Sequence, residues 1–151
     1  GQEAAFSWQL RLGTERNLAV SIHCLRAWGR LFDLLRDGPR PVRGFLLHSY
    51  GGPVEMVEPL AGLGAYFSFP GYYLHPRKQR QCEVFRRVPP ERLLIETDAP
   101  DQLPPSTLDG FLPLTDSTHG RSLNHPPNLS AIYLALPRHF AHPSPTLTPT
   151  A

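Results

Sequence analysis

The feature that most constrains the fold is a series of four short apolar runs separated by segments with helical spacing. The runs are LAVSIH (18–23), VRGFLLH (42–48), AYFSFPG (65–71) and RLLIETDAP (92–100). Segments 25–38, 53–64 and 75–90 lie between them, and a further helix is predicted over 2–16. Short strands that alternate with helices indicate parallel βαβ units. We therefore predict an α/β fold in which helices cover both faces of a parallel sheet, because apolar runs without polar alternation suit strands buried on both sides.

This regular alternation ends at about residue 100. Residues 101–127 form a polar segment broken by prolines, which we predict to be a loop. The segment NLSAIYLAL (128–136) has the pattern of a short helix. Residues 137–151 contain four prolines, and we predict that they are disordered. The chain is thus expected to comprise one folded region, 1–136, and a proline-rich tail, 137–151.

Charge and composition exclude few functions. Lys and Arg number 15 and Asp and Glu number 13, for a formal net charge of +2. This balance does not by itself indicate a nucleic-acid surface, which needs clustered basic residues. No apolar run is long enough to span a bilayer and no signal-peptide pattern opens the chain, so we expect an intracellular protein, cytoplasmic or nuclear, without membrane contact. Cys24 and Cys82 lack CxxC spacing, which favours free thiols and leaves a disulfide open.

Three of the predicted strands end at a residue that commonly binds metals. These residues are His23, His48 and Asp98. The carboxyl ends of parallel strands meet at one edge of the sheet, where α/β folds build their sites. Two neutral imidazoles and a carboxylate are suitable ligands for a divalent metal such as zinc or manganese. A cation there would also offset the cost of placing a carboxylate at the tip of a buried strand.

Each of these residues also has a purely structural interpretation. A single histidine such as His23 or His48 is more often satisfied by hydrogen bonds within the core or at its rim. Asp98 precedes an Ala-Pro pair and could cap a turn. Glu96 lies on the opposite side of the strand from Thr97 and could be a buried partner for an arginine. The agreement of three strand ends in position and chemistry favours the metal site.

The other histidines are weaker candidates. His75 is expected at the start of a helix, as a cap or a surface residue. His119 and His125 lie in the long loop, from which they could approach the site. His139 and His142 lie in the predicted tail and are expected to be solvated.

The order and spacing of these motifs resemble the TatD family of metal-dependent hydrolases. The matching segments are 18–35, GFLLHSYGG (44–52), AYFSFPG and LLIETDAPDQLPP (93–105), and RSLNHPPNL (121–129) resembles the family's Arg-x-Asn-x-Pro segment. The resemblance covers residues 2–135. It implies an amidohydrolase-type TIM barrel that binds one or two divalent metal ions (Mg, Mn or Zn). It also implies hydrolysis of phosphodiesters, often as a deoxyribonuclease.

The resemblance implies a role for each matched residue. His23 and His48 are similar to the metal-binding histidines at the ends of the family's fifth and sixth strands. Asp98 resembles the aspartate at the end of the eighth strand, which binds metal and takes a proton from the attacking water. A bound metal of this kind lowers the pKa of water toward neutrality. Glu96 and Thr97 resemble positions that support the ligands.

The chain also departs from the family pattern. The family's first-strand His-x-His pair and its Gly-Glu-x-Gly-Leu-Asp strand have no counterpart in these residues. A complete (β/α)₈ barrel takes about 250 residues, so we predict a partial barrel of about four βα units, resembling the C-terminal half of the family. Many relatives have an arginine two residues after the first of these histidines. Leu25 stands there, and Arg26, one place later, is the candidate phosphate contact.

Three functional hypotheses follow from this pattern. The leading one is a metal-dependent hydrolase acting on DNA, with little activity in this chain alone, because a site without all its ligands orients water poorly. The alternative is an inactive fragment that acts by pairing with another chain, since a half barrel exposes sheet edges that favour self-association. A third keeps the enzyme but changes the substrate to another phosphodiester or an amide.

Overall fold

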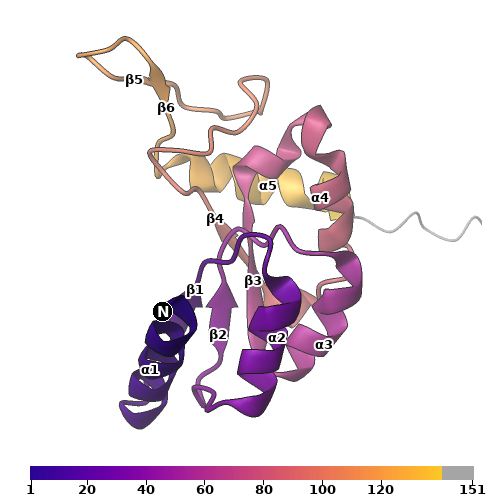
Figure 1. Cartoon of the computed structure of the whole chain (residues 1–151). Helices are drawn as coiled ribbons and strands as arrows, with labels where there is room; N and C mark the ends of the chain where they lie inside the picture. Colours follow the sequence, from indigo (N-terminus) through magenta and orange to yellow (C-terminus); the bar gives the residue numbers. More distant parts are fainter. Residues whose placement is uncertain (141–151) are drawn as a thin grey trace, which may run out of the picture.

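A four-stranded parallel sheet forms the centre of the protein, and helices connect its strands (Figure 1). The structure, a computed structural model, describes residues 1–140. Its elements in chain order are α1 (Gln2–Glu15), β1 (Val20–Ile22), α2 (Trp28–Asp37), β2 (Phe45–Leu47), η1 (Val54–Met56), α3 (Val57–Gly62), β3 (Ala65–Pro70), η2 (Gly71–Leu74), η3 (Pro76–Lys78), α4 (Gln79–Phe85), η4 (Pro90–Arg92), β4 (Leu93–Glu96), β5 (Leu114–Thr115), β6 (Ser122–Leu123) and α5 (Asn128–Phe140).

The order of the strands confirms the predicted βαβ arrangement. The sheet runs β1-β2-β3-β4, and every neighbouring pair is parallel. In this register Ile22 is the partner of Leu47, Leu47 of Phe67, and Phe67 of Leu93. All four carboxyl ends therefore lie at one edge of the sheet, which we call the carboxyl edge.

The two faces of the sheet differ in how well they are covered. Phe45, Leu47 and Phe67 point to a core that also includes Leu35 of α2 and Leu60 of α3, and each is at most 1% exposed.

The opposite face, here called the open face, carries Ser21, Leu46, Tyr66 and Leu94, and these four side chains line a shallow apolar depression of about 370 Å³. Leu94 is 45% exposed. The prediction that both faces are covered is therefore wrong within residues 1–140, because only one face meets helices. Self-association through the sheet edges stays a prediction.

A cluster of aromatic rings fixes the loop that leaves β2. Tyr50 is 1% exposed and its ring meets those of Trp28 and Phe67 at centroid distances of 4.7 Å and 5.0 Å. Its hydroxyl donates a hydrogen bond to the Pro53 carbonyl over 2.8 Å. A side chain at position 52 would lie 2.6 Å from the Tyr50 ring, so only glycine lets the loop pass this closely. Tyr50 thus anchors the two residues that precede it, His48 and Ser49.

Several boundaries differ from the sequence prediction. The strands are shorter than the apolar runs, and Leu18 is 50% exposed outside β1. The segment predicted as one loop contains the antiparallel pair β5–β6, which extends away from the sheet in Figure 1. Helix α5 runs to Phe140, four residues past the expected boundary at 136, and the rest of the predicted tail lies outside the described residues. Both cysteines are free, as predicted, and burial raises the pKa of each thiol.

Within residues 1–140 the longest helices are too short or too polar to cross a bilayer.

Two adjacent leucines of β2 test the difference between the faces. Leu47 is fully buried in the core and Leu46 is half-buried on the open face. Leu47→Ala should lower the free energy of unfolding by about 2–5 kcal/mol, because a buried leucine leaves a cavity. Leu46→Ala should cost less than half as much. Urea denaturation of both variants measures the difference, and equal losses would show that the open face is covered in solution.

Candidate functional site

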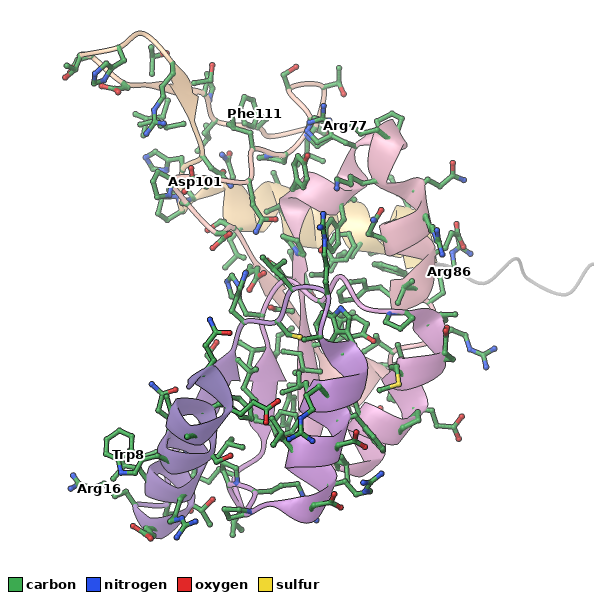
Figure 2. The ribbon with its side chains drawn as sticks, viewed as in Figure 1. Trp8, Arg16, Arg77, Arg86, Asp101 and Phe111 are labelled. Atoms are coloured by element: carbon green, nitrogen blue, oxygen red, sulfur yellow. The ribbon has the colours of Figure 1, made fainter. Side chains whose placement is uncertain are left out.

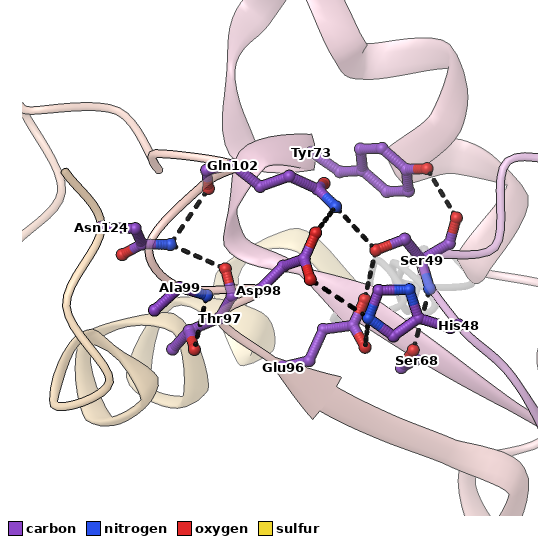
Figure 3. Close-up of polar contacts among 10 residues, drawn as sticks. All are labelled: His48, Ser49, Ser68, Tyr73, Glu96, Thr97, Asp98, Ala99, Gln102 and Asn124. Atoms are coloured by element: carbon purple, nitrogen blue, oxygen red, sulfur yellow. Dashed lines mark hydrogen bonds and ion pairs between the residues drawn. The ribbon is translucent and has the colours of Figure 1, made fainter. Parts of the chain in front are cut away.

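Three titratable side chains meet at the carboxyl edge, with His48 between two carboxylates (Figure 3). The Nε2 atom of His48 lies 3.3 Å from Oε2 of Glu96 and 3.3 Å from Oδ1 of Asp98. The side chains are only partly accessible, at 26% for His48, 14% for Glu96 and 33% for Asp98. They come from the ends of β2 and β4, which are separated in the sheet by β3.

The alternation of side chains along the strands explains why they meet. Residues two apart in a strand share a face. His48 therefore continues the side of Leu46, and Glu96 that of Leu94, which is the open face. His23 continues the side of Ser21 in the same way, and its ring lies 5.9 Å from that of His48. The side chain of His23 is exposed.

Neutral side chains hold the outer oxygen of each carboxylate. Ser49 donates a hydrogen bond to Oε1 of Glu96, and the Gln102 amide donates one to Oδ2 of Asp98. The same Gln102 amide reaches the Ser49 hydroxyl over 2.9 Å, so the two carboxylates belong to one network (Figure 3). Because Oε1 of Glu96 and Oδ2 of Asp98 accept these hydrogen bonds, the other oxygen of each carboxylate, Oε2 and Oδ1, is turned toward His48.

The backbone of this network lies in an unusual conformation. Ser49, Asp98 and Gln102 have φ angles of 45°, 57° and 48°. Arg26, just beyond His23, has a φ of 59°. These are four of the five non-glycine residues with positive φ that the structure records. Such conformations are costly for residues with a side chain and concentrate at functional sites, where surrounding contacts impose them.

Asn124 supplies contacts that impose this conformation on residues 97–103, here called the Asp98 loop. Its side chain is 1% exposed and its Nδ2 atom donates to the carbonyls of Thr97 and Gln102, over 2.7 Å and 3.1 Å. Its backbone amide donates to the Pro100 carbonyl over 2.8 Å. The Oδ1 atom in turn accepts from Asn128 of α5 over 3.0 Å. The loop is therefore tied at three carbonyls to a buried asparagine that α5 holds in place.

Tyr73 supports the network through the backbone of Ser49. Its hydroxyl donates to the Ser49 carbonyl over 3.0 Å, and its side chain is buried. Burial, with a smaller contribution from the negative charge of Glu96, raises the pKa of Tyr73 to about 12. The phenol therefore remains a protonated donor throughout the physiological range.

The donors fit a divalent metal in their chemistry and in their pairwise spacing. Two ligand atoms bound at about 2.1 Å to a tetrahedral ion stand about 3.4 Å apart. The 3.3 Å distances from His48 to each carboxylate are close to this value. As the side chains stand, however, no three His, Cys, Asp or Glu residues in the described part of the chain are spaced to hold one ion together.

Some of the predicted site residues lie together at the carboxyl edge and others do not. His48 and Asp98 are in contact, and His23 is their neighbour, as the strand ends indicated. Thr97 points elsewhere, since its hydroxyl accepts from the Ala99 amide, and the Arg26 side chain is exposed. Their roles, and the ligand roles of the three others, stay predictions.

Glu96 corrects one of the structural interpretations. It was offered as a buried partner for an arginine. Among the described residues its carboxylate oxygens contact Nε2 of His48 and the Ser49 hydroxyl, and no arginine. The carboxylate therefore belongs to the site and not to a structural arginine pair.

The remaining histidines lie apart from this cluster in their contacts. His75 does not cap η3 through its side chain, because its Nε2 atom contacts the Leu103 carbonyl at 3.1 Å. His119 pairs with Asp116 in the β5–β6 hairpin at 2.9 Å. His125 follows Asn124, and its Nδ1 atom is buried without a partner in the described structure. The predictions for His139 and His142 concern side chains outside the described part.

Sequence reasoning missed Ser49, Gln102 and Asn124 as site residues. All three lie in segments that the motifs already covered, directly after His48, four residues after Asp98, and in the RSLNHPP segment. The signal was a polar residue beside a strand end. It was too weak to use, because serine, glutamine and asparagine are equally common in ordinary turns.

Asn124→Ala tests the tie between α5 and the Asp98 loop. We expect a loss of about 1–3 kcal/mol in the free energy of unfolding for each buried carbonyl left unpaired. Hydrogen exchange at the Asp101 amide, which donates to the Asp98 carbonyl, should accelerate. The matched control is Asp116→Ala, which removes hydrogen bonds within the β5–β6 hairpin and should leave exchange at Asp101 unchanged. Unchanged exchange at Asp101 in Asn124→Ala would contradict the tie.

Tyr73→Phe tests the buried phenol. A folded-state pKa of about 12 against an ordinary value of 10.0 means that the unfolded chain releases this proton first. The wild type should therefore lose stability between about pH 10 and 12, by up to about 1.4 kcal/mol per pH unit. Tyr73→Phe lacks this contribution and should show a shallower slope in denaturation measured across that range. Identical slopes would show that Tyr73 is solvated.

Comparison with known protein families identifies the family to which the chain belongs. The family described as TatD related DNase matches residues 1–140. The 3′-5′ ssDNA/RNA exonuclease TatD of Klebsiella pneumoniae (strain 342) is 38% identical over 104 residues, which are 68% of this chain and 40% of that protein. The protein of the same description from Escherichia coli (strain K12) is 36% identical over an equal share. The chain thus spans 40% of the length of these curated relatives.

Solved structures show the same fold. A crystal structure of YJJV, a TatD homologue from Escherichia coli K12, has a TM-score of 0.71 and 27% sequence identity, and the match covers 89% of this chain and 47% of that one. An uncharacterised amidohydrolase from Saccharomyces cerevisiae reaches a TM-score of 0.74 at 16% identity, over 93% of this chain and 54% of that one. The predicted fold, part of an amidohydrolase-like TIM barrel, is therefore confirmed. On the family match over residues 1–140, this protein belongs to the TatD family of hydrolases.

Proposed function

We propose that this chain carries the water-activating part of a divalent-metal-dependent phosphodiester hydrolase that acts on single-stranded nucleic acid. The observation that carries this proposal is the contact of His48 with both Glu96 and Asp98 at the carboxyl edge. The names of the curated relatives, which describe exonucleases on single-stranded DNA and RNA, support the substrate class.

His48 and Asp98 would hold the metal, with His23 as the second imidazole. Glu96 would bind beside them or orient His48, since its Oε2 atom faces the same Nε2 atom. A divalent cation at this place would acidify water and neutralise negative charge that develops on the phosphoryl group. The donor set, two imidazoles and carboxylates, suits zinc or manganese, whereas magnesium prefers oxygen ligands.

The protein's own groups would manage the proton and the geometry. Gln102 donates to Oδ2 of Asp98, so Oδ1, which faces His48, is the oxygen that would meet a bound metal ion or take a proton from the water beside it. Ser49 and Gln102 fix the two carboxylates relative to each other. A general base held in this way contributes typically 10²–10⁴-fold to rate. Because no three donors share one ion position as the side chains stand, we expect weak metal binding and slow hydrolysis from this chain alone.

Asp98→Asn is the direct test of the role of Asp98. Wild type with Mn²⁺ should shorten an end-labelled single-stranded oligonucleotide, and EDTA should stop the reaction. Asp98→Asn should lower the rate by about 10²-fold or more, because the base and a charged ligand are lost together. The matched control is Asp109→Asn, which changes an exposed aspartate and should retain the wild-type rate.

Calorimetric titration with Mn²⁺ and Zn²⁺ separates binding from catalysis in the same variants. Binding by wild type and Asp109→Asn, but not by Asp98→Asn, would support the ligand role. Hydrolysis that survives EDTA, or that is equal in Asp98→Asn and wild type, would refute the proposed function.

A further inference from the structure

Two cations lie over a single aromatic ring next to the carboxyl edge. The Arg77 guanidinium carbon is 5.4 Å from the centroid of the Tyr72 ring, and the Lys78 ammonium is 5.0 Å from it. Both distances are within the range of a cation–π interaction. Tyr72 is half-buried, so its ring is fixed on one side by the protein. We call these three residues the Tyr72 patch.

The positive charges of the Tyr72 patch are not compensated by a carboxylate. None of the ion pairs within residues 1–140 involves Arg77 or Lys78. Arg86, at the other end of α4, pairs instead with Glu83 at 2.9 Å. A ring quadrupole attracts cations without neutralising them. The Tyr72 patch therefore presents two full charges in a partly ordered arrangement.

The Tyr72 patch is connected to the candidate site through two neighbouring residues, Tyr73 and His75. The next residue, Tyr73, donates to the Ser49 carbonyl over 3.0 Å. The His75 ring lies 5.4 Å from that of Tyr72, and its Nε2 atom contacts the Leu103 carbonyl, at the end of the Asp98 loop. Figure 2 shows Arg77 at the same end of the molecule as Asp101, while Arg16 lies at the opposite end.

We propose that the Tyr72 patch is a phosphate-binding subsite for the single-stranded polynucleotide whose cleavage takes place at His48 and Asp98. This inference rests on the proposed function. A flexible single-stranded polynucleotide presents a phosphate at every nucleotide. A cation pair beside the reactive centre can therefore bind the phosphates of the nucleotides that flank the bond to be cut. Channels for single strands combine basic side chains with aromatic rings in this way. The Tyr72 ring positions the two cations through its cation–π contacts.

The sequence offers an unusually clean probe of this subsite. Lys78 is the only lysine in the chain. Reductive methylation with ¹³C-formaldehyde therefore labels Lys78 and the terminal amine alone, and keeps the positive charge of both. In EDTA, so that nothing is hydrolysed, titration with an oligothymidylate should shift the Lys78 methyl signal and leave that of Gly1 unchanged.

Salt dependence measures the number of phosphate contacts. Oligothymidylate binding is followed by fluorescence anisotropy across a range of salt concentrations, again in EDTA. The slope of log K against log salt should become shallower by about 0.7 for each cation removed from a single-strand contact. Arg77→Ala and Lys78→Ala should each show this change. Arg16→Ala, an exposed arginine at the far end, should keep the wild-type slope.

Variants of Tyr72 test the role of the ring. Tyr72→Phe keeps the aromatic face and should bind as wild type does, whereas Tyr72→Leu should weaken binding without changing the net charge. Tyr133→Leu, an exposed tyrosine on α5 that is 63% accessible, is the matched control and should have no effect.

The binding and hydrolysis measurements test the phosphate-binding subsite and the proposed hydrolase function separately. Binding with the expected slopes but no hydrolysis under any metal would support the subsite and refute the proposed function. Hydrolysis with unchanged slopes in Arg77→Ala and Lys78→Ala would refute the subsite and leave the function. No shift of the Lys78 signal, or an equal shift with polyglutamate, would also overturn it, because the patch would then bind no strand or any anion.

Discussion

The parallel register of the four strands is the constraint on which the rest of the structure depends. Each strand must be followed by a crossover before the next can pair in the same direction. Every strand therefore ends at the same edge, and the residues after those ends meet there, although 75 positions separate His23 from Asp98 in the chain. The sheet alternation then turns His48 and Glu96 to the open face, away from the apolar core. A polar site can form in this way without disturbing the packing.

The polar network at the carboxyl edge fixes the positions of the carboxylates, and it does so with backbone angles that are unfavourable for residues with a side chain. Ser49, Asp98 and Gln102 all adopt left-handed backbone angles. Such angles cost free energy that other contacts must offset. Buried hydrogen bonds from Asn124 and the burial of Tyr50 and Tyr73 do so. The position of the Asp98 carboxylate thus depends on groups contributed by β2, η2 and the segment before α5, and not on its own strand alone.

The two faces of the sheet have different consequences for function. The core face gives the chain its stability, since its residues are almost fully buried. Along the strands the open face forms a shallow apolar depression. At its carboxyl edge, where the candidate site lies, the same face is polar. Beside that edge the Tyr72 patch adds uncompensated positive charge.

The sequence by itself determined the α/β class, the four strands of the parallel sheet, and the convergence of His23, His48 and Asp98. These follow from periodicity and from the rule that parallel strands end together. The motifs also carried the resemblance to the TatD family, which the comparisons confirm.

Only the tertiary structure decided how Glu96 is used, which side chains hold the carboxylates, and that one sheet face stays uncovered. The contacts of Glu96 with Ser49 and His48, and the hydrogen bond from Asn124 to the Thr97 carbonyl, join residues 27 to 48 positions apart. Local patterns cannot predict such contacts, because a serine or an asparagine in a turn has the same propensity whether or not a distant carboxylate or carbonyl meets it. The fold brings the partners together, and their hydrogen bonds then give each side chain its role.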